Sequence, residues 1–186
     1  MRRWLTCTLL SVAALGIAGA ASGAQLTIMP GVIVTLEPPA ESEETTRFLL
    51  ALPLPAALEG STIDFTRLTM GVRVGMGELS GEDGPFVVDA YAVTTEWDPE
   101  AVGWNTGWDT PGGDFDESTH SSHIGVADTT ASVSLDLTHV LQAWVDGSIG
   151  NAGIIITVPS ATCWEITEID GSLDEPAVAV YYTRGE

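Results

Sequence analysis

The sequence predicts an all-β fold, an antiparallel β-sandwich of jelly-roll type with one short helix near residues 138–146. Three observations lead to this prediction. Short runs of β-type residues recur along the chain, separated by turn residues. Apolar and polar positions alternate within several of these runs, as they do in half-buried strands. One stretch breaks the pattern with the spacing of a helix.

Seven runs are expected to form the strands: residues 25–36, 47–52, 61–74, 87–95, 131–137, 153–158 and 177–183. In one of them, Val88 and Ala90 alternate with Asp89 and Tyr91. The run at 154–156 consists of three isoleucines and is apolar on both faces, which indicates a central strand.

The expected helix lies within residues 136–147. Apolar side chains at positions 140, 141, 144 and 145 fall on one helical face over two turns, so Trp144 is expected to pack over the sandwich. Thr138 is placed to accept hydrogen bonds from the free N–H groups of the first turn. Gly147 can take the left-handed conformation that ends a helix.

Three long polar segments, 37–46, 98–125 and 167–175, are expected to be loops. Because binding residues concentrate on loops held by a rigid scaffold, these segments are where function is expected.

Residues 1–24 have the layout of a cleavable secretory signal. Arg2 and Arg3 precede an apolar stretch at 5–20, and small residues run up to Ala24. Cleavage is expected after Ala24, with cleavage after Gly23 as the alternative. The mature chain, 25–186, is then expected to form a single domain. No later apolar run approaches the roughly 20 residues that span a bilayer, so an extracellular or cell-surface location is expected.

The mature chain is strongly acidic. It contains all 26 acidic residues against four arginines and no lysine, and loss of Arg2 and Arg3 changes the formal net charge from −20 to −22. Such a surface repels itself unless it is screened, which favours a salty or cation-rich environment. The same charge argues against nucleic acid, anionic lipid and acidic polysaccharide as partners, because few cations remain to neutralise them.

Cys163 is the only cysteine left once Cys7 departs with the signal, so an internal disulfide is excluded. We interpret it as a small buried apolar residue beside Trp164, with a reactive thiol or an intermolecular bridge as the alternatives.

Four sequence blocks follow one another along the mature chain. They read RFLL with a Pro-x-Pro turn and GSTI within 47–63, WDPEAVGWN at 97–105, WDTPGGD at 108–114, and LDLTHVLQAW followed by NAG within 135–153. In this order they resemble the DNRLRE-domain family, which is related to the archaeal disaggregatase modules and to a carbohydrate-binding module family that includes alginate binders. The resemblance covers nearly the whole mature chain and implies a β-sandwich that binds carbohydrate.

The chain departs from that family in three ways. Gly103 stands where the family usually has Thr, so a side-chain hydrogen bond near Trp104 is in doubt. The terminal acidic-arginine motif is not visible. The basic residues expected of an alginate-binding face have no counterpart, which puts alginate in doubt as the ligand.

The aromatic residues divide into two groups. Trp97 and Trp104 flank a strand end and are expected to join a core cluster that closes the sandwich. Trp108 lies in a loop of Gly, Asp, Thr and Pro, where it could stack on a sugar ring or fold back on the core. Tyr91 is the second candidate for stacking on a sugar.

Closely spaced carboxylates beside glycine turns suit Ca²⁺, which takes six to eight oxygen ligands. Candidate ligands occur within nine residues: Asp109, Asp114, Asp116 and Glu117. The alternative is a solvated acidic loop. His120 and His123 could complete a transition-metal site with Asp114 or Asp116, or could simply be exposed.

The chain carries no Gly-x-Ser-x-Gly elbow, phosphate loop or His-Glu-x-x-His motif, and we expect it not to be an enzyme. Two functions remain open. One is a secreted module that binds a neutral extracellular glycan, with Trp108 or Tyr91 as the stacking residue and Ca²⁺ in its loops. The other is a structural cell-surface or extracellular-matrix protein that assembles with other surface proteins through cation-bridged acidic surfaces.

Overall fold

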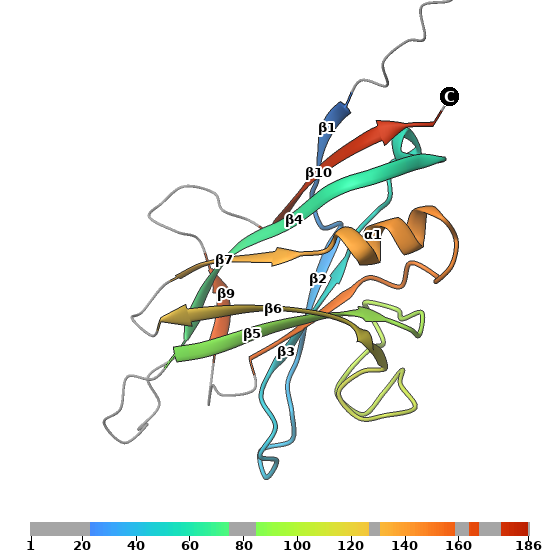
Figure 1. Ribbon diagram of the computed structural model, residues 1–186. Helices are drawn as coiled ribbons and strands as arrows, with labels where there is room; N and C mark the ends of the chain where they lie inside the picture. The colour runs from blue at the N-terminus through green and yellow to red at the C-terminus, as the bar shows by residue number, and fades with distance from the viewer. Residues whose placement is uncertain (1–22, 75–84, 127–130, 159–163, 168–175, 186) are drawn as a thin grey trace, which may run out of the picture.

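The computed structural model describes residues 23–74, 85–126, 131–158, 164–167 and 176–185, which form two antiparallel sheets and one α-helix (Figure 1). Sheet A has the order β1 (Gly23–Ile28), β10 (Ala177–Arg184), β4 (Ser61–Val74) and β7 (Ala131–Asp136), with β9 (Trp164–Thr167) also paired to β4. Sheet B has the order β2 (Val32–Leu36), β3 (Arg47–Ala51), β8 (Ile154–Thr157), β5 (Pro85–Val93) and β6 (Phe115–Val126). A 3-10 turn, η1 (Ala56–Leu58), and helix α1 (Thr138–Val145) complete the described elements.

The strand order is that of a jelly roll. In each sheet, a strand from the C-terminal part of the chain lies between two strands that precede it in the sequence. β10 separates β1 from β4, and β8 separates β3 from β5. Every pairing is antiparallel, so the chain is wound as a long hairpin that rolls into two packed sheets. The predicted fold class is confirmed.

The main core lies between the two sheets. Alternate residues of β4 and β8 point inward, among them Leu68, Met70, Ile154 and Ile156, which are fully buried. Ile155, between the last two, is also fully buried but belongs to a separate cluster on the other face of sheet B. The run of isoleucines is therefore a central strand, as predicted.

Helix α1 packs against the sandwich beside β4, with Val140, Leu141 and Trp144 buried. It ends as predicted: Gly147 has φ 69°, its N–H donates to the carbonyl of Trp144, and the next N–H, of Ser148, reaches back to Ala143.

The start of α1 differs from the prediction. Leu137 is the N-cap residue and its side chain makes no capping hydrogen bond, whereas the N–H of Thr138 donates to the carboxylate of Asp136 at 2.9 Å. The hydroxyl of Thr138 instead accepts a hydrogen bond from the backbone N–H of Thr66 in β4 at 2.8 Å. Because the ladder between β7 and β4 stops at Asp136 and Arg67, no strand pairs with Thr66 on the side of β4 away from β10, and the hydroxyl of Thr138 satisfies this N–H.

Two predictions about strands were wrong. The run at 25–36 is not one strand, because the chain turns at 29–31 and places β1 and β2 in different sheets. The segment 98–125 is not one loop, because from Phe115 onward it forms strand β6. β6 is an edge strand with a largely polar sequence, so it lacks the apolar alternation that marks a half-buried strand. β9 was not predicted either.

Three sequence features lie outside the described residues. They are the signal segment before Gly23, Cys163, and residues 168–175 of the loop expected at 167–175. The expected cleavage point after Ala24 falls within β1, where Gly23 and Ala24 pair with Thr183 and Tyr182. No helix in the described ranges is long and apolar enough to cross a membrane.

Candidate functional site

A second, smaller core covers part of the outer face of sheet B. Leu36, Leu49 and Ile155 point outward from β2, β3 and β8, and Trp104 packs on them. Residues 94–114, which we call the cover segment, bring this tryptophan over the sheet. Trp104 is therefore a core residue, as the sequence predicts, and it anchors the expected ligand-binding loop on the sheet together with the buried Gly112 and Gly113.

Asp114 holds the cover segment in shape. Its carboxylate accepts hydrogen bonds from the backbone N–H groups of Asp109 (2.9 Å) and Thr110 (2.8 Å) and from the hydroxyl of Thr95 (3.0 Å). Burial tends to raise the pKa of Asp114, but these hydrogen bonds together outweigh it, and the pKa lies below its ordinary value. Asp114 is thus an ionised carboxylate engaged by its own loop.

Gly112 and Gly113 let the cover segment approach the sheet closely. Both have positive φ, 87° and 113°. A Cβ at Gly113 would lie 2.8 Å from the Ile155 side chain, and one at Gly112 would lie 2.9 Å from the Trp104 ring. Only glycine fits at these two positions without displacing the second core.

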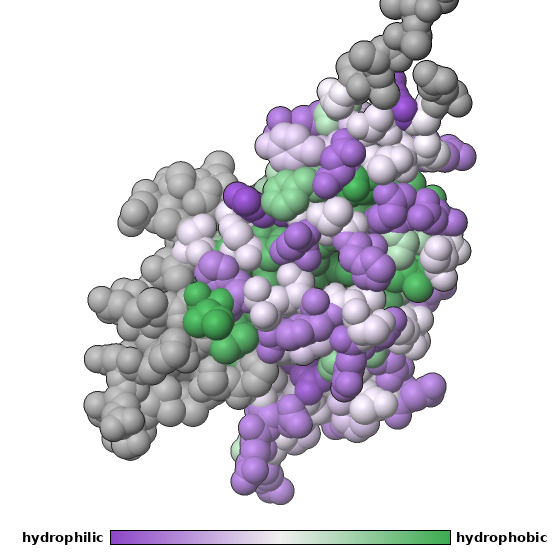
Figure 2. Space-filling view, viewed as in Figure 1, coloured by the Kyte–Doolittle hydropathy of each residue, from purple (hydrophilic) through white to green (hydrophobic). Residues whose placement is uncertain are grey.

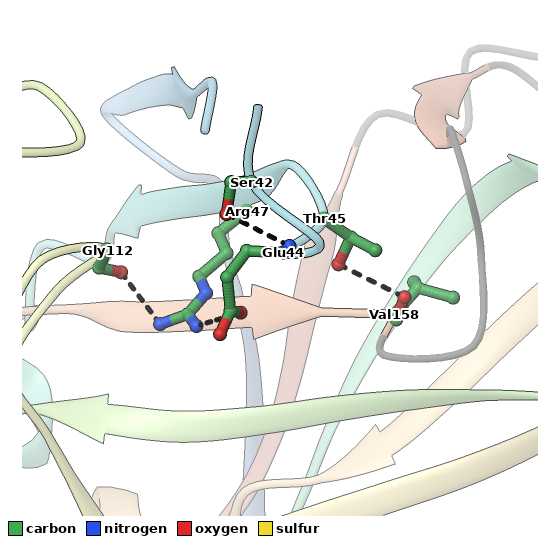
Figure 3. A network of polar contacts seen from close by, with 6 residues as sticks. All are labelled: Ser42, Glu44, Thr45, Arg47, Gly112 and Val158. Atoms are coloured by element: carbon green, nitrogen blue, oxygen red, sulfur yellow. Dashed lines mark hydrogen bonds and ion pairs between the residues drawn. The ribbon is translucent and has the colours of Figure 1, made fainter. Parts of the chain in front are cut away.

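Arg47 joins three parts of the chain on this face (Figure 3). From β3 its guanidinium donates to the carbonyl of Gly112 (3.0 Å) and to the carboxylate of Glu44 (2.9 Å). It also lies 4.9 Å from the centre of the Trp104 ring, a cation–π distance. This arginine stabilises the fold and is only 15 % exposed.

Trp108 is packed against the second core and half-buried. Its indole N–H donates to the carbonyl of Gly103 at 2.9 Å. The polar end of the ring is therefore engaged within the cover segment, and part of the ring surface remains accessible.

Beside the cover segment, sheet B presents a row of rings that we call the aromatic strip: Phe115, Tyr91 and His120. The Tyr91 ring lies 4.7 Å from Phe115 and 5.0 Å from His120, and it is nearly parallel to the imidazole, at 16°. Nε2 of His120 lies 2.7 Å from a carboxylate oxygen of Asp89. The imidazole is thus held by a ring on one side and a carboxylate at its edge.

The His120 ring of the strip is exposed, whereas the Asp89 carboxylate that holds it is nearly buried. The His120 side chain is 46 % exposed, whereas that of Asp89 is 11 % exposed. Burial, followed by the charges of Asp89 and Glu117, raises the pKa of Tyr91 against a lowering effect of Arg47. Tyr91 therefore keeps its hydroxyl proton and can donate a hydrogen bond at neutral pH.

A bulge in β6 creates this arrangement. The pairing of β5 with β6 jumps from Ser121 opposite Ala90 to Asp116 opposite Ala92, so residues 117–120 lie outside the regular ladder. The hydroxyl of Thr119 accepts the N–H of Ala92 at 2.8 Å and thereby anchors the bulge to β5. The bulge turns His120 back over Tyr91.

The predicted metal ligands do not gather in one place. His120 bonds to Asp89 on the outer face, whereas His123 is paired with Val88, whose side chain faces the main core. Cross-strand partners point to the same face, so the two histidines lie on opposite faces of sheet B.

The remaining candidate carboxylates are spread along the chain. Asp109 and Glu117 are exposed, and hydrogen bonds from the side chain and backbone of Ser118 lower the pKa of Asp116. Within the ranges that the structure describes, no three His, Cys, Asp or Glu side chains form a group that could hold a metal ion.

A shallow pocket of about 300 Å³ lies between β6 and α1. Its lining includes Asp116 and Ser118 from β6 and His139 and Asp146 from the region of α1. Because its only ring is the imidazole of His139, with no Phe, Tyr or Trp in the lining, it is a weaker candidate for sugar recognition than the aromatic strip.

The sequence analysis missed Phe115 of the strip and Asp89, the carboxylate that bonds to the strip's His120. Asp89 is an acidic residue inside an apolar strand, a signal that could have singled it out. Phe115 and the bulge could not be recognised, because their strand was taken for a loop. Tyr91 was proposed as a stacking residue, and the structure places it in the middle of the strip.

No family model matches the chain, and a search of curated proteins finds no significant match.

Proposed function

We propose that this chain is a secreted, non-catalytic module that binds an extracellular carbohydrate on the outer face of sheet B, and that it is a member of the DNRLRE-type modules. The observation that carries the proposal is the exposed His120 ring, stacked on Tyr91 and fixed by Asp89.

Sugar recognition needs a flat ring surface for the C–H face of the sugar and fixed polar groups for its hydroxyls. The strip supplies both, since its rings lie beside the carboxylates of Asp89 and Glu117. Carboxylates accept strong hydrogen bonds from hydroxyl groups. Because β5 and β6 hold these side chains, the surface is ordered before a ligand arrives and loses little entropy on binding.

The charge of the chain favours a neutral ligand. The formal net charge is −20, and Arg47, which lies 5.7 Å from the Phe115 ring of the strip, is already paired with Glu44. An acidic polymer would meet carboxylates at the strip and across the whole protein. A neutral glycan meets no such repulsion.

The absence of catalysis is part of the proposal. The described hydrogen bond of His120 goes to Asp89, and within the described residues no hydroxyl or thiol bonds to the imidazole. A histidine and a carboxylate without a hydroxyl or thiol nucleophile lack the triad that serine and cysteine hydrolases use.

The experiment is a screen of neutral polysaccharides and oligosaccharides with and without CaCl₂, using the mature wild-type protein, His120→Ala and His123→Ala. His123→Ala is the matched control, because it removes the same side chain from the other face of β6. We expect the wild type and the control to bind a neutral polymer, and His120→Ala to bind it at least tenfold more weakly, roughly 1.4 kcal/mol.

Equal binding by His120→Ala and wild type would remove the strip as the site. No binding to any neutral glycan, together with self-association that depends on Ca²⁺, would favour the structural role in a cell surface or matrix instead.

A further inference from the structure

The outer face of sheet A carries an aromatic pair of its own. Tyr181 of β10 lies opposite Phe65 of β4, with ring centroids 6.1 Å apart and planes tilted by 38°. Tyr181 is 42 % exposed, which makes it one of the few large exposed hydrophobic residues in the described ranges. In the area of β4 and β10 the surface mixes hydrophilic, intermediate and hydrophobic side chains (Figure 2).

Arg67 extends this pair along β4. Its guanidinium carbon lies 5.2 Å from the centre of the Phe65 ring. In the described part of the chain, no ion pair or hydrogen bond engages the guanidinium. Its cross-strand neighbour Asp136 points a carboxylate oxygen at the start of α1 instead, accepting from the N–H and hydroxyl of Thr138.

Gln25 completes the surface from the other side. It lies in β1 opposite Tyr181 and is exposed. The three strands therefore present two rings flanked by an amide and a guanidinium, which we call the sheet A platform: Gln25, Phe65, Arg67 and Tyr181. The donors of Arg67 and Gln25 suit sugar hydroxyls, and the rings suit the C–H face of a sugar.

The platform and the aromatic strip face in opposite directions. Side chains of β4 and β10 that alternate with the platform residues, such as Leu68 and Val180, are buried in the main core, as are those of β5 that alternate with Tyr91. Each binding surface is thus the outer face of one sheet, and the packed core separates them. A sugar on one surface cannot contact the other.

We propose that the sheet A platform is a second surface for a neutral glycan and that the protein bridges two glycan chains, one on each face. This inference rests on the proposed carbohydrate-binding function of the strip for the class of its ligand. Two sites on opposite faces of the protein cannot both bind one short glycan segment. On a glycan polymer they can form a cross-link from two weak contacts, because binding at one site raises the effective concentration of polymer at the second.

The test is isothermal titration calorimetry with a short neutral oligosaccharide that binds the wild type, chosen to be too short to reach both faces. We expect two oligosaccharides per wild-type protein and one for either Tyr181→Ala or His120→Ala. We expect no binding by the double variant. Met29→Ala is the matched control, since Met29 is 45 % exposed, lies between β1 and β2, and belongs to neither set of site residues.

A second readout measures bridging directly. The wild type should raise the viscosity or turbidity of a solution of the corresponding polymer, and each single-site variant should bind the polymer without doing so. Arg67→Ala should weaken binding at the platform and leave the site at His120 unchanged.

The outcomes separate the two proposals. One site in the wild type that His120→Ala abolishes and Tyr181→Ala leaves intact would overturn the platform and keep the strip. One site that only Tyr181→Ala abolishes would overturn the strip and the bridging. A wild type that binds no neutral oligosaccharide would overturn both.

Discussion

At the scale of single residues, much of the chemistry in the cover segment serves the fold. Asp114, Gly112 and Arg47 hold this segment against sheet B, and Trp108 uses its indole N–H within it. The side chains of Asp114 and Trp108 are therefore engaged by other groups of the same segment. The exposed ring that can meet a ligand, His120, comes from the neighbouring strand.

Asp114 gives a pH-dependent prediction. Its pKa in the folded protein lies below its ordinary value of about 3.9, so the ionised carboxylate stabilises the fold above that pH, and the stabilisation is lost as pH falls through the lower folded pKa. We expect Asp114→Asn to reduce the free energy of unfolding by about 1–2 kcal/mol at pH 7, and this deficit to shrink below pH ~4. Urea denaturation from pH 7 to pH 2.5 measures it, with the exposed Glu117→Gln as control. A deficit that is the same at both ends would show that charge plays no part.

Trp108 gives a prediction that separates packing from binding. Because the ring is half-buried on the second core, Trp108→Ala should lower the free energy of unfolding by roughly 2 kcal/mol, less than the 3–5 kcal/mol of a fully buried ring. If the ring only packs, glycan affinity should stay within twofold of the wild type. Loss of glycan binding in a variant that is still folded at the assay temperature would restore Trp108 as a stacking residue.

At the scale of elements, α1 substitutes for a missing strand. Beyond the end of β7, two side chains of the helix satisfy the backbone of β4: the hydroxyl of Thr138 accepts from Thr66, and Oε1 of Gln142 accepts from Ile63 at 2.7 Å. The helix therefore closes the edge of sheet A through hydrogen bonds as well as through Trp144. This explains why polar residues occur at fixed places in an otherwise packed helix.

Gln142→Leu tests this role. The leucine cannot accept a hydrogen bond, so the N–H of Ile63 loses its partner, and we expect a loss of about 1–3 kcal/mol in the free energy of unfolding. His139→Leu, on the exposed side of the same helix, serves as the control and should cost much less. Guanidinium denaturation of the two variants provides the comparison, and equal losses would contradict the proposed edge closure.

At the scale of the whole molecule, charge dominates. A formal net charge of −20 on 186 residues opposes the compact state through self-repulsion, which salt screens. The same net charge also opposes association between copies of the protein.

A thermal melt distinguishes screening from a bound cation. We expect the midpoint of unfolding to rise by several degrees between 0.02 and 1 M NaCl, because the Debye length falls from more than 20 Å to about 3 Å. CaCl₂ should act through ionic strength to the same extent. A larger rise at submillimolar Ca²⁺ would instead reveal a specific site, for which Asp109, Asp116 and Glu117 are the first residues to replace.

The sequence by itself determined the class of fold, the position and end of α1 and the central strand at 154–156. These depend on local periodicity, turn residues and composition, which are readable within a few consecutive residues. Only the tertiary structure decided that β6 is a strand, that its bulge folds His120 onto Tyr91, and that Phe65 and Tyr181 lie side by side. A local pattern states which face of a strand is apolar, but it does not state which distant strand will lie beside it. Both proposed binding surfaces are made by such pairings.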